Sequence, residues 1–105
     1  MMKTTGTLPA IITVVMMSSS TFAADVEHGE MLARQWCSNC HVIKADQAVG
    51  GDTAPTFASI AETSVERTDD LRAWLADPHP PMPNFDLTRR EIDDLLAYIE
   101  SLRPN

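Results

Sequence analysis

The chain has 105 residues, with 15 acidic and 8 basic side chains and a formal net charge of −7 at pH 7. This length permits one small domain, whose modest core commonly depends on a metal, a disulfide or another staple. The acidic balance excludes nucleic acid as an expected partner, because phosphates and carboxylates repel each other.

The first 23 residues have the composition of a secretory signal peptide. Lys3 is the only charged residue among them, an apolar stretch follows over residues 8–17, and small polar residues precede Phe22. A bilayer span needs about 20 apolar residues, so an uncleaved membrane anchor is the weaker alternative. We therefore expect a periplasmic protein that is not stably inserted in the membrane after cleavage.

The cleavage site is predicted from the small residues near position 23. A cut after Ala23 places Thr21 and Ala23 at the small-residue positions, whereas a cut after Ala24 would place bulky Phe22 there. This assigns residues 1–23 to the signal peptide and residues 24–105 to one domain.

A helix is predicted over residues 26–36, directly before Cys37. Asp25 is a suitable N-cap for it, and Glu27 is well placed against the positive end of the helix dipole. Residues at positions i, i+3, i+4 and i+7 share one stripe of this helix: Gly29, Leu32, Ala33 and Trp36.

The next five residues, Cys37-Ser38-Asn39-Cys40-His41, form the C-x-x-C-H arrangement that marks covalent attachment of a c-type haem. The two thiols can reach the two vinyl groups of one haem, and the adjacent histidine can bind its iron. We therefore predict one haem c, covalently bound through Cys37 and Cys40, with His41 as an iron ligand.

Two cysteines at this spacing also permit other chemistry, namely a redox dithiol, a disulfide or half of a zinc site. Zinc would need a second pair of ligands. The sequence has no further cysteine, and His28 and His79 are isolated in it. The dithiol and the disulfide remain as alternatives to haem attachment.

Residues 41–56 lack a sustained period and contain Gly50-Gly51 and Pro55, which predicts a long loop. Loops of this length are unusual in compact domains unless they wrap something, and here the wrapped group would be the haem. A short helix over residues 57–62 is weakly indicated.

A clearer helix is predicted from Thr68 or Asp69 to about Ala76, and Pro78 stops it. Its apolar residues share one face: Leu71, Trp74 and Leu75. The segment Pro80-Pro81-Met82-Pro83 follows as a loop whose prolines restrict the backbone.

Met82 in this stiff loop is the predicted second iron ligand, because methionine paired with histidine is the common ligand set of cytochromes c. Met31 is a poorer candidate, since it lies on the helix that leads to the histidine side of the haem. A role for Met82 as a core filler is one alternative. Ligation by His79, or an open iron site, is another.

The final helix is predicted from Arg89 to near Leu102. Thr88 and Glu91 form a capping box, and Leu87 and Ile92 occupy the positions of a hydrophobic staple. One continuous apolar face is expected: Ile92, Leu95, Leu96, Ile99 and Leu102.

Together these segments resemble the class I monohaem cytochrome c family. The resemblance covers the first helix with Gly29, the CSNCH site, the loop with Pro55, the segment around Met82 and the last helix with Tyr98. It implies an all-α fold of three to four helices wrapped around one covalently bound haem. The N- and C-terminal helices would cross where Gly29 meets Tyr98 and its neighbour Leu95.

The resemblance also implies that Pro55 accepts a hydrogen bond from His41, which would orient the ring; a stiffening role in the loop is the alternative and the two are compatible. It further implies a haem environment of apolar residues: Phe57, Ile60, Trp74, Leu75 and Leu96.

Ligation by both His41 and Met82 would leave the iron no vacant position, so we predict an electron carrier and not an enzyme. The acidic pairs Asp69-Asp70 and Asp93-Asp94 are interpreted as solvated helix faces without a catalytic role. Two other functions are weighed. One is a haem-based sensor or small-ligand binder with displaceable Met82, and the other is a fixed cytochrome subunit of a periplasmic oxidoreductase.

Charge indicates the kind of partner. Without the leader the chain has 7 basic and 15 acidic side chains, a balance of −8. Redox proteins with basic docking patches would be steered towards such a surface. The alternative, equally weighted, is that the acidity only keeps an exported protein soluble.

Overall fold

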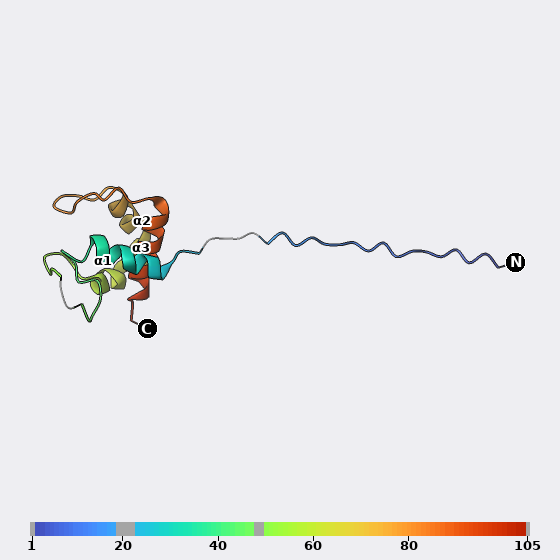
Figure 1. The fold of residues 1–105 in the computed structure, drawn as a ribbon, viewed down its shortest axis with the longest axis horizontal. Helices are drawn as coiled ribbons and strands as arrows, with labels where there is room; N and C mark the ends of the chain where they lie inside the picture. The colour runs from blue at the N-terminus through green and yellow to red at the C-terminus, as the bar shows by residue number, and fades with distance from the viewer. Residues whose placement is uncertain (1, 19–22, 48–49, 105) are drawn as a thin grey trace.

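The computed structural model describes residues 2–18, 23–47 and 50–104, and these residues form three α-helices and no strand. The helices are α1 (Val26–Trp36), α2 (Phe57–Ala76) and α3 (Arg89–Ser101). They gather at one end of the molecule, and residues 2–18 form a long tail without helix (Figure 1). The predicted all-α fold of three to four helices is confirmed for the described residues.

The predicted leader is only partly visible in this structure. Thr21 and Phe22, which the predicted cleavage site involves, lie outside the described residues. Within the part of the chain that is described, no helix combines the length and the apolar composition needed to cross a membrane.

Local signals set the ends of α1. The Asp25 side chain accepts a hydrogen bond from the backbone N–H of His28 at 3.0 Å, as predicted for an N-cap. Of the residues that share the predicted stripe, Gly29, Leu32 and Ala33 are buried. Trp36 is 42% exposed, and its ring packs on Phe85.

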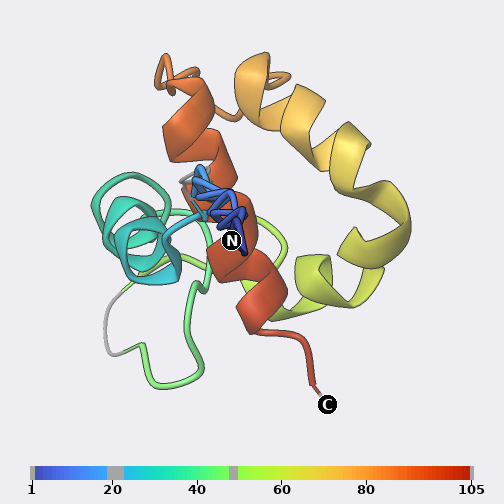
Figure 2. The same cartoon turned by 90° about the vertical axis from the view of Figure 1, so that its right-hand side faces the viewer.

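Helices α1 and α3 approach each other closely where they cross. A Cβ atom on Gly29 would overlap the main-chain carbonyl of Asp94 and the Cβ of Tyr98, so only glycine fits there. Figure 2 shows α3 between α1 and α2, and it contacts both of them. The predicted crossing of Gly29 with Tyr98 is confirmed, and the main-chain carbonyl of Asp94 lies against Gly29 as well.

Helix α2 joins the two short helices that the sequence predicted. Thr56 caps it by accepting a hydrogen bond from the Ser59 N–H at 3.1 Å. Its backbone is non-helical at Arg67, with φ −133° and ψ 27°. The Thr68 hydroxyl donates to the Ser64 carbonyl at 2.6 Å, a back-bond of the kind that bends helices. The separate helices are therefore two arms of one kinked helix.

Helix α3 begins with the predicted capping box. The Glu91 carboxylate accepts from the Thr88 N–H at 3.0 Å, and the Thr88 hydroxyl accepts from the Glu91 N–H at 3.1 Å. The backbone N–H of Thr88 lowers the pKa of the Glu91 carboxyl. The buried residues of α3 are Ile92, Asp94, Leu95, Leu96, Tyr98 and Ile99.

The interpretation of Asp93-Asp94 as a solvated helix face is wrong for Asp94. Asp94 is only 1% exposed, and its carboxylate accepts from the Asp25 N–H at 2.7 Å and contacts the His28 Nδ1 at 2.6 Å. Burial by itself raises the pKa of Asp94, but the Asp25 N–H and His28 outweigh it and hold this pKa below its ordinary value. Asp94 and His28 therefore link α1 to α3.

Candidate functional site

The CSNCH segment continues from the end of α1 as a tight turn. The N–H of Cys37 bonds to the Ala33 carbonyl at 2.9 Å, and the N–H of His41 bonds to the Cys37 carbonyl at 2.9 Å. Helix α1 thereby fixes where the two cysteines and the histidine begin. Cys37 and Cys40 are free thiols, of which Cys37 is buried and Cys40 is exposed.

The burial of Cys37 also affects its chemistry. Burial, with a smaller contribution from Cys40, raises the pKa of Cys37 to about 11. A thiol with such a pKa is almost entirely protonated at neutral pH, and the thiolate is the reactive form in thiol–disulfide exchange. This is an unsuitable environment for the redox dithiol considered above.

The His41 ring is held from two directions. Its Nδ1 lies 2.6 Å from the carbonyl oxygen of Pro55. A carbonyl can only accept, so the proton is on Nδ1 and the lone pair is on Nε2, which is the form that binds a metal. The Phe57 ring packs at a tilt against the imidazole, with centroids 5.3 Å apart.

The loop after His41 folds back onto the CSNCH turn. The Gly51 N–H donates to the Ser38 carbonyl at 3.1 Å, and the Ala54 N–H donates to the Cys40 carbonyl at 3.0 Å. A Cβ atom on Gly51 would overlap the carbonyl of Asn39, so this close approach requires glycine. The loop thereby brings Pro55 against His41.

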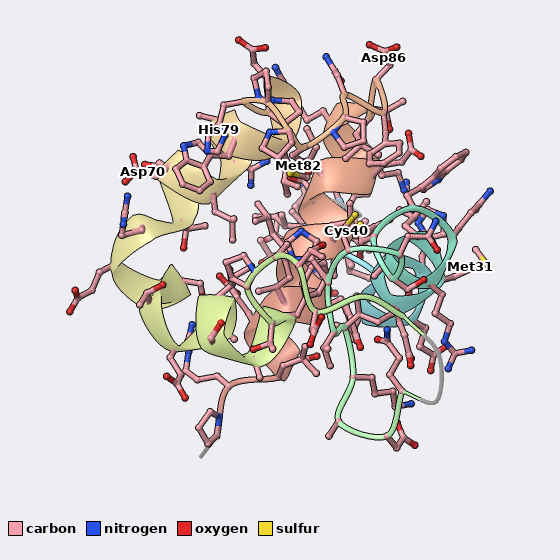
Figure 3. The ribbon with its side chains drawn as sticks, turned by 90° about the vertical axis from the view of Figure 1, so that its left-hand side faces the viewer. Met31, Cys40, Asp70, His79, Met82 and Asp86 are labelled. Atoms are coloured by element: carbon pink, nitrogen blue, oxygen red, sulfur yellow. The ribbon has the colours of Figure 1, made fainter. Side chains whose placement is uncertain are left out.

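Met82 comes from the segment between α2 and α3. It is half-buried and packs against the hydrophobic core, and its N–H donates to the His79 carbonyl at 3.1 Å. In Figure 3, Cys40 and Met82 lie towards the centre of the view, whereas Met31 lies at the outer edge beside α1. Met31 is 56% exposed, which makes it the poorer ligand candidate.

The predicted apolar surroundings are only partly gathered into the core. Phe57 is buried between the rings of His41 and Tyr98, and Leu75 and Leu96 are buried as well. Trp74 differs, because it is 52% exposed and its ring meets His79 edge-on with centroids 5.0 Å apart. At three residues from Leu71 it lies on the flank of the α2 stripe that Leu71 and Leu75 turn towards the core.

These donors fit a haem. The turn offers two free thiols and an imidazole with an available Nε2, and a separate loop offers a half-buried thioether. Histidine and methionine are the axial ligands of cytochromes c. Among the described residues, no three His, Cys, Asp or Glu side chains gather so as to hold a metal ion.

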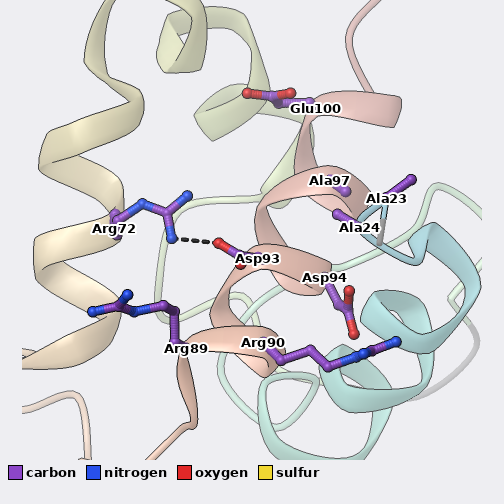
Figure 4. Close-up of a pocket in the computed structure, with 9 residues that line it drawn as sticks. All are labelled: Ala23, Ala24, Arg72, Arg89, Arg90, Asp93, Asp94, Ala97 and Glu100. Atoms are coloured by element: carbon purple, nitrogen blue, oxygen red, sulfur yellow. Dashed lines mark hydrogen bonds and ion pairs between the residues drawn. The ribbon is translucent and has the colours of Figure 1, made fainter. Parts of the chain in front are cut away.

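A groove of different character lies along α3, between α2 and the segment that leads into α1 (Figure 4). It contains an ion pair between Arg72 of α2 and Asp93 of α3. None of the predicted site residues lines it. We therefore assign it to the packing of α2 on α3 and not to the haem site.

Gln47 makes side-chain contacts with the CSNCH turn that the sequence did not predict. Its side-chain amide bonds to backbone groups of Ser38, His41 and Ile43, all in or beside the CSNCH turn. A single glutamine in an aperiodic loop has no sequence pattern that would reveal this. The neighbouring Gly50-Gly51 pair is the nearest signal, because two glycines indicate a close backbone approach.

Comparisons with known proteins agree with this geometry. Residues 24–99 match the family described as cytochrome c oxidase, cbb3-type, subunit III. The chain is 47% identical over 94 residues to cytochrome c-552 of Bradyrhizobium diazoefficiens, with 90% of each chain covered. It is 27% identical over 78 residues to a cytochrome c-553-like protein of Synechocystis sp., covering 74% of this chain and 70% of that protein. No solved structure matches the chain.

Proposed function

This chain belongs to the cytochrome c family, and we propose that it is an exported carrier of single electrons whose haem iron is bound by His41 and Met82. Family membership implies one covalently bound haem c, and Cys37 and Cys40 form the motif that attaches it. When bound, the haem supplies one-electron exchange between ferrous and ferric iron. The relatives are likewise named as cytochromes.

The observation that carries the proposal is the state of His41. Its Nδ1 donates to the Pro55 carbonyl at 2.6 Å, and Phe57 packs against the ring. The hydrogen bond fixes both the tautomer and the orientation, and it makes Nε2 a more basic ligand. His41 is therefore prepared to bind iron in one orientation.

Met82 supplies the second ligand in this proposal. A thioether is neutral, so it favours the ferrous state and raises the reduction potential. Pro81 and Pro83 on either side restrict the backbone dihedrals, which lowers the entropy cost of holding a weak ligand in place. With both axial positions filled by the protein, we propose electron transfer without enzymatic catalysis.

In the proposal, the buried apolar residues exclude water from the haem. Phe57, Leu75 and Leu96 are buried, and a dry environment with low polarity favours the less charged ferrous state. In the proposal, the exposed face of Trp74 adds to the apolar surface offered to the haem.

The proposed location is the periplasm, reached through the leader at residues 1–23. The proposed partners are redox proteins with basic docking patches, attracted by the 15 acidic side chains. Because such attraction is screened by ions, the rate of electron exchange with a basic partner should fall as salt increases. A rate that does not change with salt would argue for acidity as a solubility feature only.

Optical spectra of the purified holoprotein test the ligation. We expect a methionine-to-iron charge-transfer band in the far red of the ferric protein. It should disappear in Met82→Ala and persist in the matched variant His79→Ala. The reverse pattern would contradict the proposal. Rapid binding of carbon monoxide by the reduced wild-type protein at neutral pH would favour a small-ligand sensor with a displaceable methionine.

A second candidate is a fixed subunit of an oxidoreductase, and one observation favours it. The family matched by residues 24–99 is described as a subunit of an oxidase. The proposed ligands and redox chemistry would be the same, but the partner would be permanent. Stoichiometric co-purification with an oxidoreductase would support the subunit, and recovery as a separate protein would support the carrier.

A further inference from the structure

We propose that Gln47 is a positioning residue for the haem-attachment turn, an inference that rests on the proposed binding of iron by His41. The Gln47 Oε1 accepts from the Ile43 N–H at 2.8 Å. Its Nε2 donates to the carbonyls of Ser38 at 3.3 Å and His41 at 3.4 Å. One amide thus joins the start of the turn, its histidine and the residue two positions beyond.

The hydrogen-bonding groups of glutamine match this position. A side-chain amide offers a carbonyl acceptor and two N–H donors, and here the acceptor and the donors face backbone groups of the opposite kind. A carboxylate would keep the acceptor but lose both donors. A shorter asparagine side chain would have to span the same three groups with one methylene fewer.

The contact with Ile43 continues into the core. The Ile43 carbonyl accepts from the Tyr98 hydroxyl at 2.7 Å, and Tyr98 is buried in α3. Burial raises the pKa of Tyr98, which keeps the phenol protonated as a donor. The backbone at Ile43 is therefore held by α3 through its carbonyl and by Gln47 through its N–H.

Gly50 lies close to the Gln47 amide. A Cβ atom on Gly50 would overlap the Gln47 Nε2 and approach the Ser38 carbonyl, and Gly50 has a φ of +152°. Both features favour glycine. The absence of a side chain at Gly50 thus leaves room for the Gln47 amide beside the Ser38 carbonyl.

The consequence for His41 is a second anchor. The Pro55 carbonyl holds the ring at Nδ1, and Gln47 holds the backbone of the same residue through its carbonyl. Fixing the backbone limits the side-chain directions available to the imidazole. In this proposal Gln47 would influence the iron through His41, whose backbone carbonyl it contacts.

The test compares Gln47→Ala with the wild-type holoprotein by NMR. Exchange of the Ile43 N–H should accelerate by a factor of about 5 to 30, the change that corresponds to losing one or two hydrogen bonds. Amides in α3, such as Leu95, should keep their exchange rates. The paramagnetically shifted ring resonances of His41 in the ferric protein should move.

Gln47→Glu distinguishes the role of the acceptor oxygen from the role of the donor nitrogen, because it keeps the first and removes the second. It should retain protection of the Ile43 N–H and still move the His41 resonances, because only the donors are lost. If Gln47→Ala does not accumulate as a holoprotein, this variant carries the same test. Gln35→Ala, at an exposed glutamine of α1, is the matched control and should change neither signal.

Unchanged His41 resonances in both Gln47 variants would overturn the inference, as would equal acceleration of the α3 amides, which would indicate only a loss of stability. A wild-type protein without paramagnetically shifted His41 ring signals has a different meaning. That result would contradict the proposed iron ligation itself.

Discussion

Two regions of the molecule differ in how deeply their side chains are buried. One is the crossing of α1 with α3, and the other is the segment from Trp74 to Met82. At the crossing, Leu95 and Tyr98 are 1% and 4% exposed, and glycine permits backbone contact. In the other region Trp74 is 52% exposed and Met82 is half-buried. The crossing is thus a closely packed scaffold, while the second region leaves apolar and thioether side chains partly exposed.

This difference predicts different consequences of mutation. Substitutions at the crossing should lower the free energy of unfolding, because they remove or crowd buried contacts. Substitutions near Met82 should act on the iron first.

Gly29→Val should have the largest effect on stability. The added Cβ overlaps the Asp94 carbonyl and the Tyr98 Cβ, so the helices must separate at a cost of about 3 kcal/mol. Denaturant unfolding of the holoprotein measures it. Met31→Val is the control on the exposed face of α1 and should cost about 0.5 kcal/mol. Equal losses in the free energy of unfolding for the two variants would contradict the close packing at the crossing.

Asp94→Ala should have the second largest effect. It should lower the free energy of unfolding by about 2 kcal/mol, because a buried carboxylate and its hydrogen bonds are lost. The adjacent Asp93→Ala should cost less than about 1 kcal/mol, because the pair of Asp93 with Arg72 is partly exposed. Urea unfolding of both variants at neutral pH makes the comparison. A larger loss at Asp93 would contradict the role of Asp94 in the crossing.

Asp94 also gives a pH dependence with a definite sign. Its folded-state pKa lies below the unfolded value, so its contribution is present above the ordinary aspartate pKa of about 3.9 and is lost as pH falls through the lower folded value. Wild-type stability should therefore decline more steeply than that of Asp94→Asn below about pH 4. Parallel acid profiles would exclude this contribution.

The contact of Trp36 with Phe85 should have the smallest effect. It joins the end of α1 to the loop after Met82, with ring centroids 5.5 Å apart. A double-mutant cycle of Trp36→Ala and Phe85→Ala should give a coupling of about 0.5 to 1.5 kcal/mol. A coupling near zero would mean that the two regions are independent at this point.

The sequence predicted best where the signal is local. Asp25 and the pair of Thr88 with Glu91 marked the starts of α1 and α3, since capping depends on residues within one turn. The CSNCH site was equally local. The fold class followed from these elements and from the resemblance to a family.

Several contacts between residues far apart in the sequence could not be predicted from it. The burial of Asp94 depends on His28, which is 66 positions away, and no local pattern records that pairing. Trp36 and Trp74 lie on predicted apolar stripes and are nevertheless exposed, because helix periodicity predicts a face but not which of its residues another element covers. Gln47 acts through backbone groups, which any sequence contains.

The proton NMR spectrum of the ferrous holoprotein tests the central claim most directly. A methyl group bound to iron through sulfur lies over the porphyrin and is shifted far upfield by its ring current. We predict one such methyl resonance, present in wild type and His79→Ala and absent in Met82→Ala. A spectrum without it in the wild type, or one that keeps it in Met82→Ala, would contradict ligation by His41 and Met82.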